Sequence, residues 1–150
     1  MSGTGNKFHI YDARKTPQNV VIKGADCDQI IVMENSTNAD VFMRIYNNDG
    51  SEVNACGNAT RCVAYLIGQG ASVIETKAGM LRAFATGKMV KVDMGKPVFA
   101  WQDIPLSEEF PDLEGGFAVS MGNPHIVFFT SDIDNFDLKT LGKKWRTRPL

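Results

Sequence analysis

The pattern of apolar and polar residues predicts several short β-strands along the first 94 residues of the chain. In residues 41–46 every second side chain, from Val41 to Ile45, falls on one face, and the polar or aromatic side chains fall on the other. Residues 29–34 form a continuous apolar run that predicts a strand buried on both faces. Three further strands are predicted over residues 72–77, 80–86 and 89–94, with Ala78-Gly79 and Gly87-Lys88 as hairpin turns.

One segment changes to helical spacing directly after Cys56. Its apolar residues recur every three or four positions: Ala59, Cys62, Val63, Leu66 and Ile67. Asn58 is a candidate cap at its start, and Gly68 is expected to end it. Arg61 is its one charged residue, so we expect a helix that is buried on most sides.

The remaining third of the chain begins with a connector. Residues 96–116 are rich in proline and acidic residues, which disfavour regular structure. A second β-rich stretch starts at Phe117, is interrupted at Met121–His125 and resumes as far as Thr130. We therefore predict a first lobe over residues 1–103, and a linker with the beginning of a second lobe over residues 104–150.

Composition places the chain among folded proteins. It has 150 residues, of which 43% are hydrophobic and 22% charged, enough for a real core. Lys and Arg (16) nearly balance Asp and Glu (17), which argues against a nucleic-acid partner. No apolar run approaches the ~18 residues of a membrane span, and the first residues lack the apolar stretch of a signal peptide. We expect a cytoplasmic protein with no membrane partner.

The cysteines suggest reactive or core thiols rather than a disulfide framework. Their number is odd, with Cys27, Cys56 and Cys62 in a chain that shows no secretion signal. The only histidines are His9 and His125, and there is no CxxC pair, so a zinc site of ordinary spacing is not expected. We predict core positions for Cys27 and Cys62.

Cys56 differs because it lies just before the predicted helix. The first turn of a helix has unpaired N–H groups and a positive dipole end, which favour a thiolate and can also hold a carboxylate. Gly57 would let a ligand approach the backbone closely. A thiolate beside a carboxylate site suits abstraction of a proton next to that carboxylate. Position alone also allows Cys56 to be a small buried hydrophobe.

Several groups of residues, in chain order, resemble the diaminopimelate epimerase family. They are Gly5-Asn6 with Phe8, Asp28-Gln29, Arg44–Glu52, Ala55–Cys62, Met94–Pro97 and Val119–His125. Together they cover nearly the whole chain, and their fixed order makes the resemblance specific.

The resemblance implies an α+β fold of two similar lobes, each a curled, mostly antiparallel sheet around a central helix. This chain would hold one lobe and an incomplete second one. It also implies a cofactor-independent isomerase that converts LL-diaminopimelate to meso-diaminopimelate for lysine and peptidoglycan synthesis, with neither pyridoxal phosphate nor a metal. In the family one cysteine removes the α-proton as a thiolate, and a second cysteine delivers a proton from the opposite face.

Site residues are carried over from the family by position. Cys56 matches the first catalytic cysteine, and His125 matches a histidine near the reacting centre. The positions expected to contact the substrate are Asn6, Gln29, Asn47, Gly57, Asn58 and Asn123. Several of these also have an ordinary explanation, because Asn6, Asn47 and Asn123 fall in turns, where asparagine is common.

The chain also departs from the family pattern. The second catalytic cysteine motif is absent, and the spacing from Asp12 to Gln29 is too short for the helix that the family has there. A fragment, a sequence with residues missing and a degenerate homologue all remain open. We expect no activity from this chain alone, with diaminopimelate as the substrate of the whole protein and a complementary C-terminal chain or a homodimer as partner.

Two alternatives to the epimerase stay open. One is a non-catalytic binding or structural remnant of the fold, and the other is an enzyme of the proline racemase type. The phenazine-type isomerases share the architecture but lack the cysteine pair, so Cys56-Gly57-Asn58 argues against them.

Overall fold

A computed structural model describes residues 1–15, 20, 22–100, 116–129, 131–135, 137 and 140. The chain divides into two compact units, Met1–Gly95 and Lys96–Leu150, and each is described by itself. Within the described residues no helix is both long enough and apolar enough to cross a membrane. The predicted boundary between residues 103 and 104 lies outside the described residues and stays a prediction.

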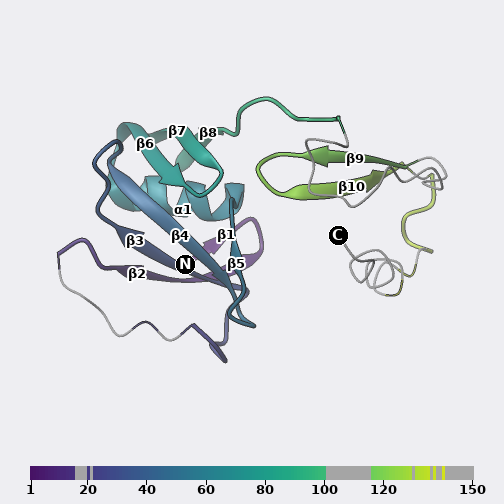
Figure 1. Cartoon of the computed structure of the whole chain (residues 1–150), viewed down its shortest axis with the longest axis horizontal. Coiled ribbons are helices and arrows are strands. Elements are labelled where there is room, and N and C mark those ends of the chain that lie inside the picture. Colours follow the sequence, from purple (N-terminus) through teal and green to yellow (C-terminus); the bar gives the residue numbers. More distant parts are fainter. Residues whose placement is uncertain are drawn as a thin grey trace. The chain divides into compact units, whose positions relative to one another are not determined.

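The first unit is a curled sheet with one helix against it (Figure 1). Its elements in chain order are β1 (Ser2–Gly3), β2 (Asn6–Asp12), β3 (Gln29–Glu34), β4 (Val41–Asn47), β5 (Glu52–Val53), α1 (Gly57–Ile67), β6 (Gly70–Thr76), β7 (Gly79–Thr86) and β8 (Met89–Asp93). The strand order is β1-β2-β3-β4-β6-β7-β8, and β5 pairs with β4 at the side. The family resemblance predicted this α+β lobe, and the prediction is confirmed.

Most strand pairs are antiparallel, and two are parallel. The parallel pairs are β2 with β3 and β4 with β6. The second is short, since only Val41 with Ile74 and Phe42 with Glu75 are in register. Parallel neighbours need a long crossover, and the chain from β4 to β6 supplies it through β5 and α1.

The core lies between the sheet and α1. Alternate residues of the strands face the helix, among them Phe8, Ile31, Met43 and Ile74, all buried. In β3 the intervening Ile30 is buried as well, so the continuous apolar run is indeed covered on both faces.

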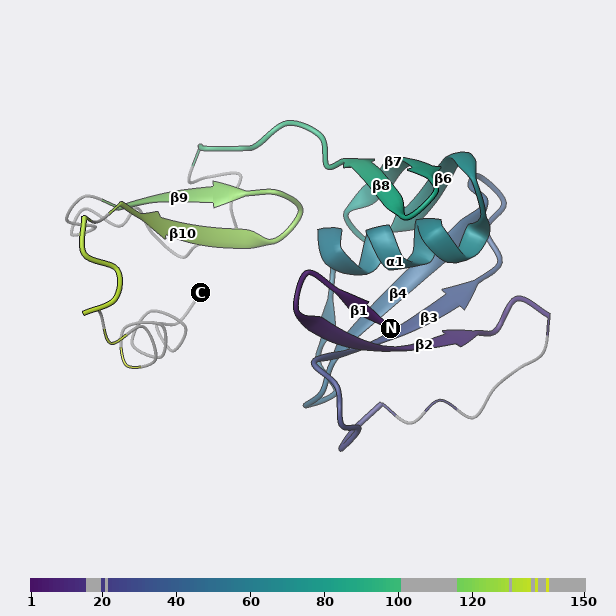
Figure 2. The ribbon, with the colours of Figure 1, turned by 180° about the vertical axis from the view of Figure 1, so that it is seen from behind.

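Helix α1 lies across the concave side of the sheet, with the β1–β2 hairpin against its first turns (Figure 2). Its inner residues Ala59, Cys62, Val63 and Ala64 are buried together with Thr60. The expectation of burial on most sides is wrong for the outer face. Tyr65 is 43% and Leu66 46% exposed, because the strands that contact α1 reach it from the sheet side.

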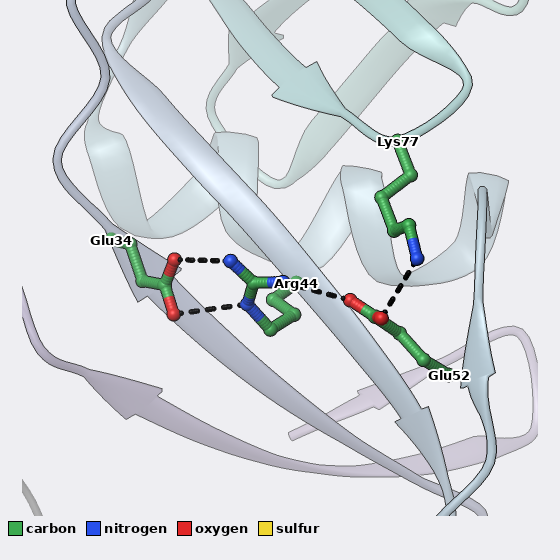
Figure 3. A network of polar contacts seen from close by, with 4 residues as sticks. All are labelled: Glu34, Arg44, Glu52 and Lys77. Carbon is green, nitrogen blue, oxygen red and sulfur yellow. Dashed lines mark hydrogen bonds and ion pairs between the residues drawn. The ribbon is translucent and has the colours of Figure 1, made fainter.

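An ion-pair network lies on the opposite face of the sheet (Figure 3). Arg44 of β4 makes two hydrogen bonds to Glu34 of β3, at 3.1 and 3.0 Å, and a third to Glu52 of β5 at 3.0 Å. Lys77, in the turn between β6 and β7, donates to the other oxygen of Glu52 at 2.9 Å. The guanidinium also lies 5.1 Å from the ring centroid of Phe42. The network therefore joins β3, β4, β5 and the turn between β6 and β7.

The second unit contains an antiparallel hairpin of β9 (Gly116–Ser120) and β10 (Pro124–Phe128). Val98 pairs with Ser120 through two backbone hydrogen bonds of 3.0 and 2.9 Å. Phe117 contacts the rings of Phe99 and Phe129, with centroids 6.2 and 5.8 Å away. The predicted β-rich stretch is thus present as a hairpin. Its interruption is shorter than predicted and spans residues 121–123, because Pro124 and His125 already belong to β10.

Candidate functional site

Cys56 lies at the start of α1, as its position in the sequence predicted. It is the residue that precedes the first helical turn, its backbone is extended (φ −152°, ψ 107°), and it is partly exposed. Both the N–H and the hydroxyl of Thr60 donate to the Cys56 carbonyl, at 2.9 and 2.8 Å. The Cys56 side chain makes no cap hydrogen bond. The thiol therefore has a fixed backbone and is not engaged in capping the helix.

The N–H groups of the first helical turn lie next to this thiol. The first intrahelical bond is donated by Thr60, so the N–H groups of Gly57, Asn58 and Ala59 have no acceptor within the helix. The first turn contains no acidic residue that would compete for them. Such a turn can accept an anionic group.

Gly57 packs closely against Met94, and its φ angle is not in the left-handed region. A Cβ at Gly57 would lie 3.3 Å from the sulfur of Met94, so a larger residue would need a small shift of that flexible side chain. Met94 belongs to the Met94–Pro97 group that pointed to the family, and it now has a role: its side chain lies against the start of α1.

Asn6 and Asn58 form one group of polar side chains, and Asn58 follows Cys56 by two positions in the sequence. Asn58 Nδ2 donates to Asn6 Oδ1 at 2.6 Å. Asn58 Oδ1 in turn accepts from the Arg61 guanidinium, which also donates to the Thr4 hydroxyl at 2.5 Å. The prediction that Asn58 caps the helix is wrong. Asn58 lies within the first turn, and its side chain contacts the β1–β2 region instead.

Gln29 and Asn47 form a second group. They are direct partners in the β3–β4 ladder, and Gln29 Nε2 donates to Asn47 Oδ1 at 3.1 Å. Asn47 Nδ2 donates to Ser51 Oγ at 3.0 Å, and Ser51 Oγ donates to Asp49 at 2.6 Å. The turn after β4 thus holds the Asn47 amide in one orientation.

Topology brings both groups to the same end of the sheet. Gln29 begins β3, and its ladder partner Phe8 lies two residues after Asn6, at the start of β2. Asn47 ends the antiparallel β4. The Asn6–Asn58 hydrogen bond places the first turn of α1 at this end as well. The structure therefore gathers the predicted residues of the first unit.

Asn123 and His125 belong to the second unit. Asn123 lies at the β9–β10 turn, where its carbonyl accepts from the N–H of Met121 at 3.1 Å. His125 is exposed on β10 and pairs with Val119 in the ladder. Their predicted roles at the reacting centre stay predictions.

The other two cysteines are core residues, as expected. All three thiols are free, but Cys27 and Cys62 are buried. Burial raises the pKa of the Cys62 thiol, which further reduces its reactivity. Among the described residues, no group of three or more histidine, cysteine or acidic side chains could hold a metal ion.

Sequence reasoning missed the residues that orient the site. Arg61, Thr4 and Ser51 were not predicted to hold any site amide. Arg61 had one signal, since it is the one charged residue of α1 and follows Asn58 by three positions, which places both on one face of a helix. Thr4 had none, because its contact joins residues far apart in the sequence.

Comparison with known proteins gives consistent matches. The family model for diaminopimelate epimerase matches residues 19–100. A diaminopimelate epimerase of Sphingopyxis alaskensis is 48% identical, over 100% of this chain and 63% of that protein. One of Rhizorhabdus wittichii is 42% identical, over 100% of this chain and 62% of its own length. The chain thus spans slightly less than two thirds of these relatives, and both alignments are longer than the chain.

Solved structures agree on the fold. A phenazine biosynthesis protein of the PhzF family from Bacillus anthracis matches with a TM-score of 0.56 and 23% identity, over 84% of this chain and 50% of that one. A hydroxyproline epimerase from Agrobacterium vitis matches with a TM-score of 0.51 and 15% identity, over 79% and 37%. At these identities the likeness extends to the architecture alone.

Proposed function

Because this chain belongs to the diaminopimelate epimerase family, whose model matches residues 19–100, we propose that the whole protein converts LL-diaminopimelate to meso-diaminopimelate. The chain supplies the first catalytic thiol and part of the carboxylate site. The observation that carries the proposal is Cys56, a partly exposed thiol at the start of α1, in a chain 48% identical to a diaminopimelate epimerase.

The reaction is a proton exchange at one carbon. The Cys56 thiolate takes the α-proton of the substrate and becomes a thiol, and the electron pair stays on the α-carbon. A second thiol, outside these 150 residues, gives its proton to the opposite face and becomes a thiolate. The configuration inverts, and nothing is oxidised or reduced.

The difficulty of this reaction is the weak acidity of an amino acid α-proton. Negative charge that develops beside the α-carboxylate needs fixed hydrogen-bond donors in a site that excludes water. The backbone N–H groups of the first α1 turn and the amides of Asn6 and Asn58 can provide these donors. Gln29 and Asn47 lie at the same sheet end and contact a more distant part of the substrate.

The rest of the site comes from the second lobe. His125 tunes a thiol near the reacting carbon, and Asn123 contacts the substrate. A complementary C-terminal segment or chain supplies the second cysteine. A non-catalytic remnant would keep the carboxylate site without the second acid, so activity of the completed protein separates these alternatives.

Alkylation of this chain tests the carboxylate site beside Cys56. Iodoacetate carries a carboxylate on the carbon that a thiolate attacks, and iodoacetamide is its neutral analogue. We expect the iodoacetate-to-iodoacetamide rate ratio at Cys56 to exceed that of free cysteine by about fivefold, which corresponds to roughly 1 kcal/mol of carboxylate stabilisation at a helix N-terminus. Peptide mapping by mass spectrometry gives the rate at each cysteine.

Matched variants identify the thiol. Cys56→Ser should remove the fast label, and Cys62→Ser should leave it unchanged, since Cys62 is buried. Diaminopimelate should slow the reaction at Cys56. Equal and slow labelling of all three cysteines, or a ratio at Cys56 no higher than that of free cysteine, would contradict the proposal.

A further inference from the structure

We propose that Arg61 is a positioning residue, which orients the side-chain amides of Asn58 and Asn6 so that both present N–H groups to a carboxylate. The inference rests on the proposed function, because it takes these two amides as part of the substrate site. Arg61 itself is not proposed to touch the substrate.

The orientation follows from the polarity of one hydrogen-bond chain. An arginine side chain can only donate, so the Asn58 atom that faces Arg61 must be Oδ1. Asn58 therefore directs Nδ2 toward Asn6, whose Oδ1 accepts at 2.6 Å. Asn6 Nδ2 then points toward Asp28 Oδ2, 3.5 Å away. The donor-only guanidinium at one end sets the direction of both amides, and the acceptor-only carboxylate at the other end, at the outer limit of hydrogen-bond distance, agrees with that direction.

Asp28 is itself held at the acceptor end. Its Oδ2 accepts the backbone N–H of Lys7 at 2.8 Å, and its own N–H donates to the Lys7 carbonyl at 3.0 Å. At the donor end, Arg61 also donates to the hydroxyl of Thr4, in the β1–β2 turn. Thr4 has a φ of 50°, an uncommon backbone conformation for threonine, and Arg61 helps to hold it.

The orientation of the two amides determines whether they attract or repel a negatively charged ligand. Each amide nitrogen has two hydrogens. The series of hydrogen bonds from Arg61 to Asp28 uses one hydrogen of each amide, so Asn58 and Asn6 each retain one N–H. Without Arg61, Asn58 can rotate its amide and present Oδ1 instead. An amide oxygen repels a carboxylate, whereas an amide N–H binds it. Loss of Arg61 should therefore weaken carboxylate recognition without removing the thiol or the helix.

The test uses the 150-residue chain and two readouts. In Arg61→Met, we expect the iodoacetate-to-iodoacetamide ratio at Cys56 to fall about two- to fivefold, within the preference of the wild-type chain and the range expected for one hydrogen bond. The rate with iodoacetamide should change by less than about twofold, because the reaction of a neutral reagent does not depend on the orientation of the two amides. In NMR spectra, the Nδ2 protons of Asn58 and Asn6 should shift and exchange faster with water, while those of the exposed Asn48 should not change.

Control variants separate charge and folding from orientation. Arg82→Met removes an equal charge from an exposed position on β7 and should leave the ratio unchanged. Arg61→Lys keeps a donor for Asn58 and should recover part of the ratio. Thermal unfolding shows which variants are folded. If Arg61→Met does not fold, Arg61→Lys carries the test, because a single ammonium group does not reproduce the planar, forked donors of the guanidinium.

The two proposals can fail separately. Unchanged Nδ2 resonances in the Arg61 variants would overturn the positioning role, even if the wild-type chain prefers iodoacetate. No preference for iodoacetate in the wild-type chain would instead contradict the proposed function. An equal loss of ratio in Arg82→Met would show an effect of charge alone, and the positioning role would be wrong.

Discussion

Gly3 shows how closely the β1–β2 hairpin approaches α1. A Cβ on Gly3 would lie 3.0 Å from the Asn58 carbonyl oxygen and 3.0 Å from the Cys62 sulfur. Neither can move easily, since one belongs to the helix backbone and the other is buried in the core. The close approach lets the Thr4 hydroxyl reach Arg61.

We therefore expect Gly3→Ala to lower the free energy of unfolding by about 1–2 kcal/mol, as other overpacking substitutions do. The adjacent Ser2→Ala, at an exposed position, should change it by less than about 0.5 kcal/mol. Urea denaturation of the three proteins provides the comparison. A Gly3→Ala chain as stable as the wild type would show that the hairpin can move away from α1.

For single residues, the sequence predicted positions relative to the helix better than it predicted side-chain contacts. Cys56 was placed correctly from its position before an apolar helix, because local spacing determines where a helix begins. The partners of Asn58 were not predictable, since Asn6 lies 52 positions away in the sequence. Asn58 looked like a cap because asparagine often is one, and a tertiary hydrogen bond overrides that local preference.

Among the elements, the sheet depends on polar links as well as on its core. The network of Glu34, Arg44, Glu52 and Lys77 joins β3, β4, β5 and the β6–β7 turn (Figure 3). Hydrogen bonds from Lys77 and Arg44 lower the pKa of Glu52 below its ordinary value. Glu52 therefore stabilises the fold while it is ionised.

A depressed folded-state pKa determines the sign of the pH dependence. The contribution of Glu52 is complete above the pKa that it has in the unfolded chain, near 4.5, and is lost as the pH falls through its lower folded value. We expect the free energy of unfolding to decrease more steeply below this pH in the wild type than in Glu52→Gln. Urea denaturation of both proteins at a series of pH values around and below 4.5 measures this difference.

Arg14 lowers the pKa of Asp12 to about 2, so Asp12 also contributes to the loss of stability in acid. The free energy of unfolding of Glu52→Gln should therefore still decrease with falling pH, but less steeply than that of the wild type. Asp134→Asn, at an exposed position of the second unit, is the control and should keep the wild-type slope. Identical slopes in Glu52→Gln and the wild type would mean that the network contributes nothing as an ion pair.

The elements themselves were predictable where the pattern was regular. Alternation located β4, and the hairpin turns located β7 and β8, within one residue of their observed ends. The exposure of Tyr65 and Leu66 was not predictable, because it depends on how far the sheet curls around α1. Periodicity reports which face of a helix is apolar, and it does not report how much surface other elements provide to cover it.

For the whole molecule, the chain matches its relatives along its entire length but spans about three fifths of them. The site that we propose needs thiols on both faces of the substrate carbon, and Cys56 is the one thiol here placed for this. The compact first unit, Met1–Gly95, contains every predicted site residue except Asn123 and His125.

We expect the isolated 150-residue chain to show no turnover of LL-diaminopimelate, because the acid on the opposite face is absent. Addition of a chain that corresponds to the remainder of a relative should restore activity, and Cys56→Ser should abolish it again. Chiral chromatography of the product measures this directly. Steady turnover by the chain alone would show that the proposed mechanism is wrong.

The short parallel contact between β4 and β6 has a consequence for folding. It divides the sheet into two groups of strands, β1 to β5 and β6 to β8, and few backbone hydrogen bonds join them. Residues before and after α1 meet there only once the long crossover has closed, which makes this contact late and entropically costly. Helix α1 contacts strands of both groups, so it helps to hold the two groups together. We therefore expect the thiol at its first turn to reach its final surroundings only when the two groups have joined.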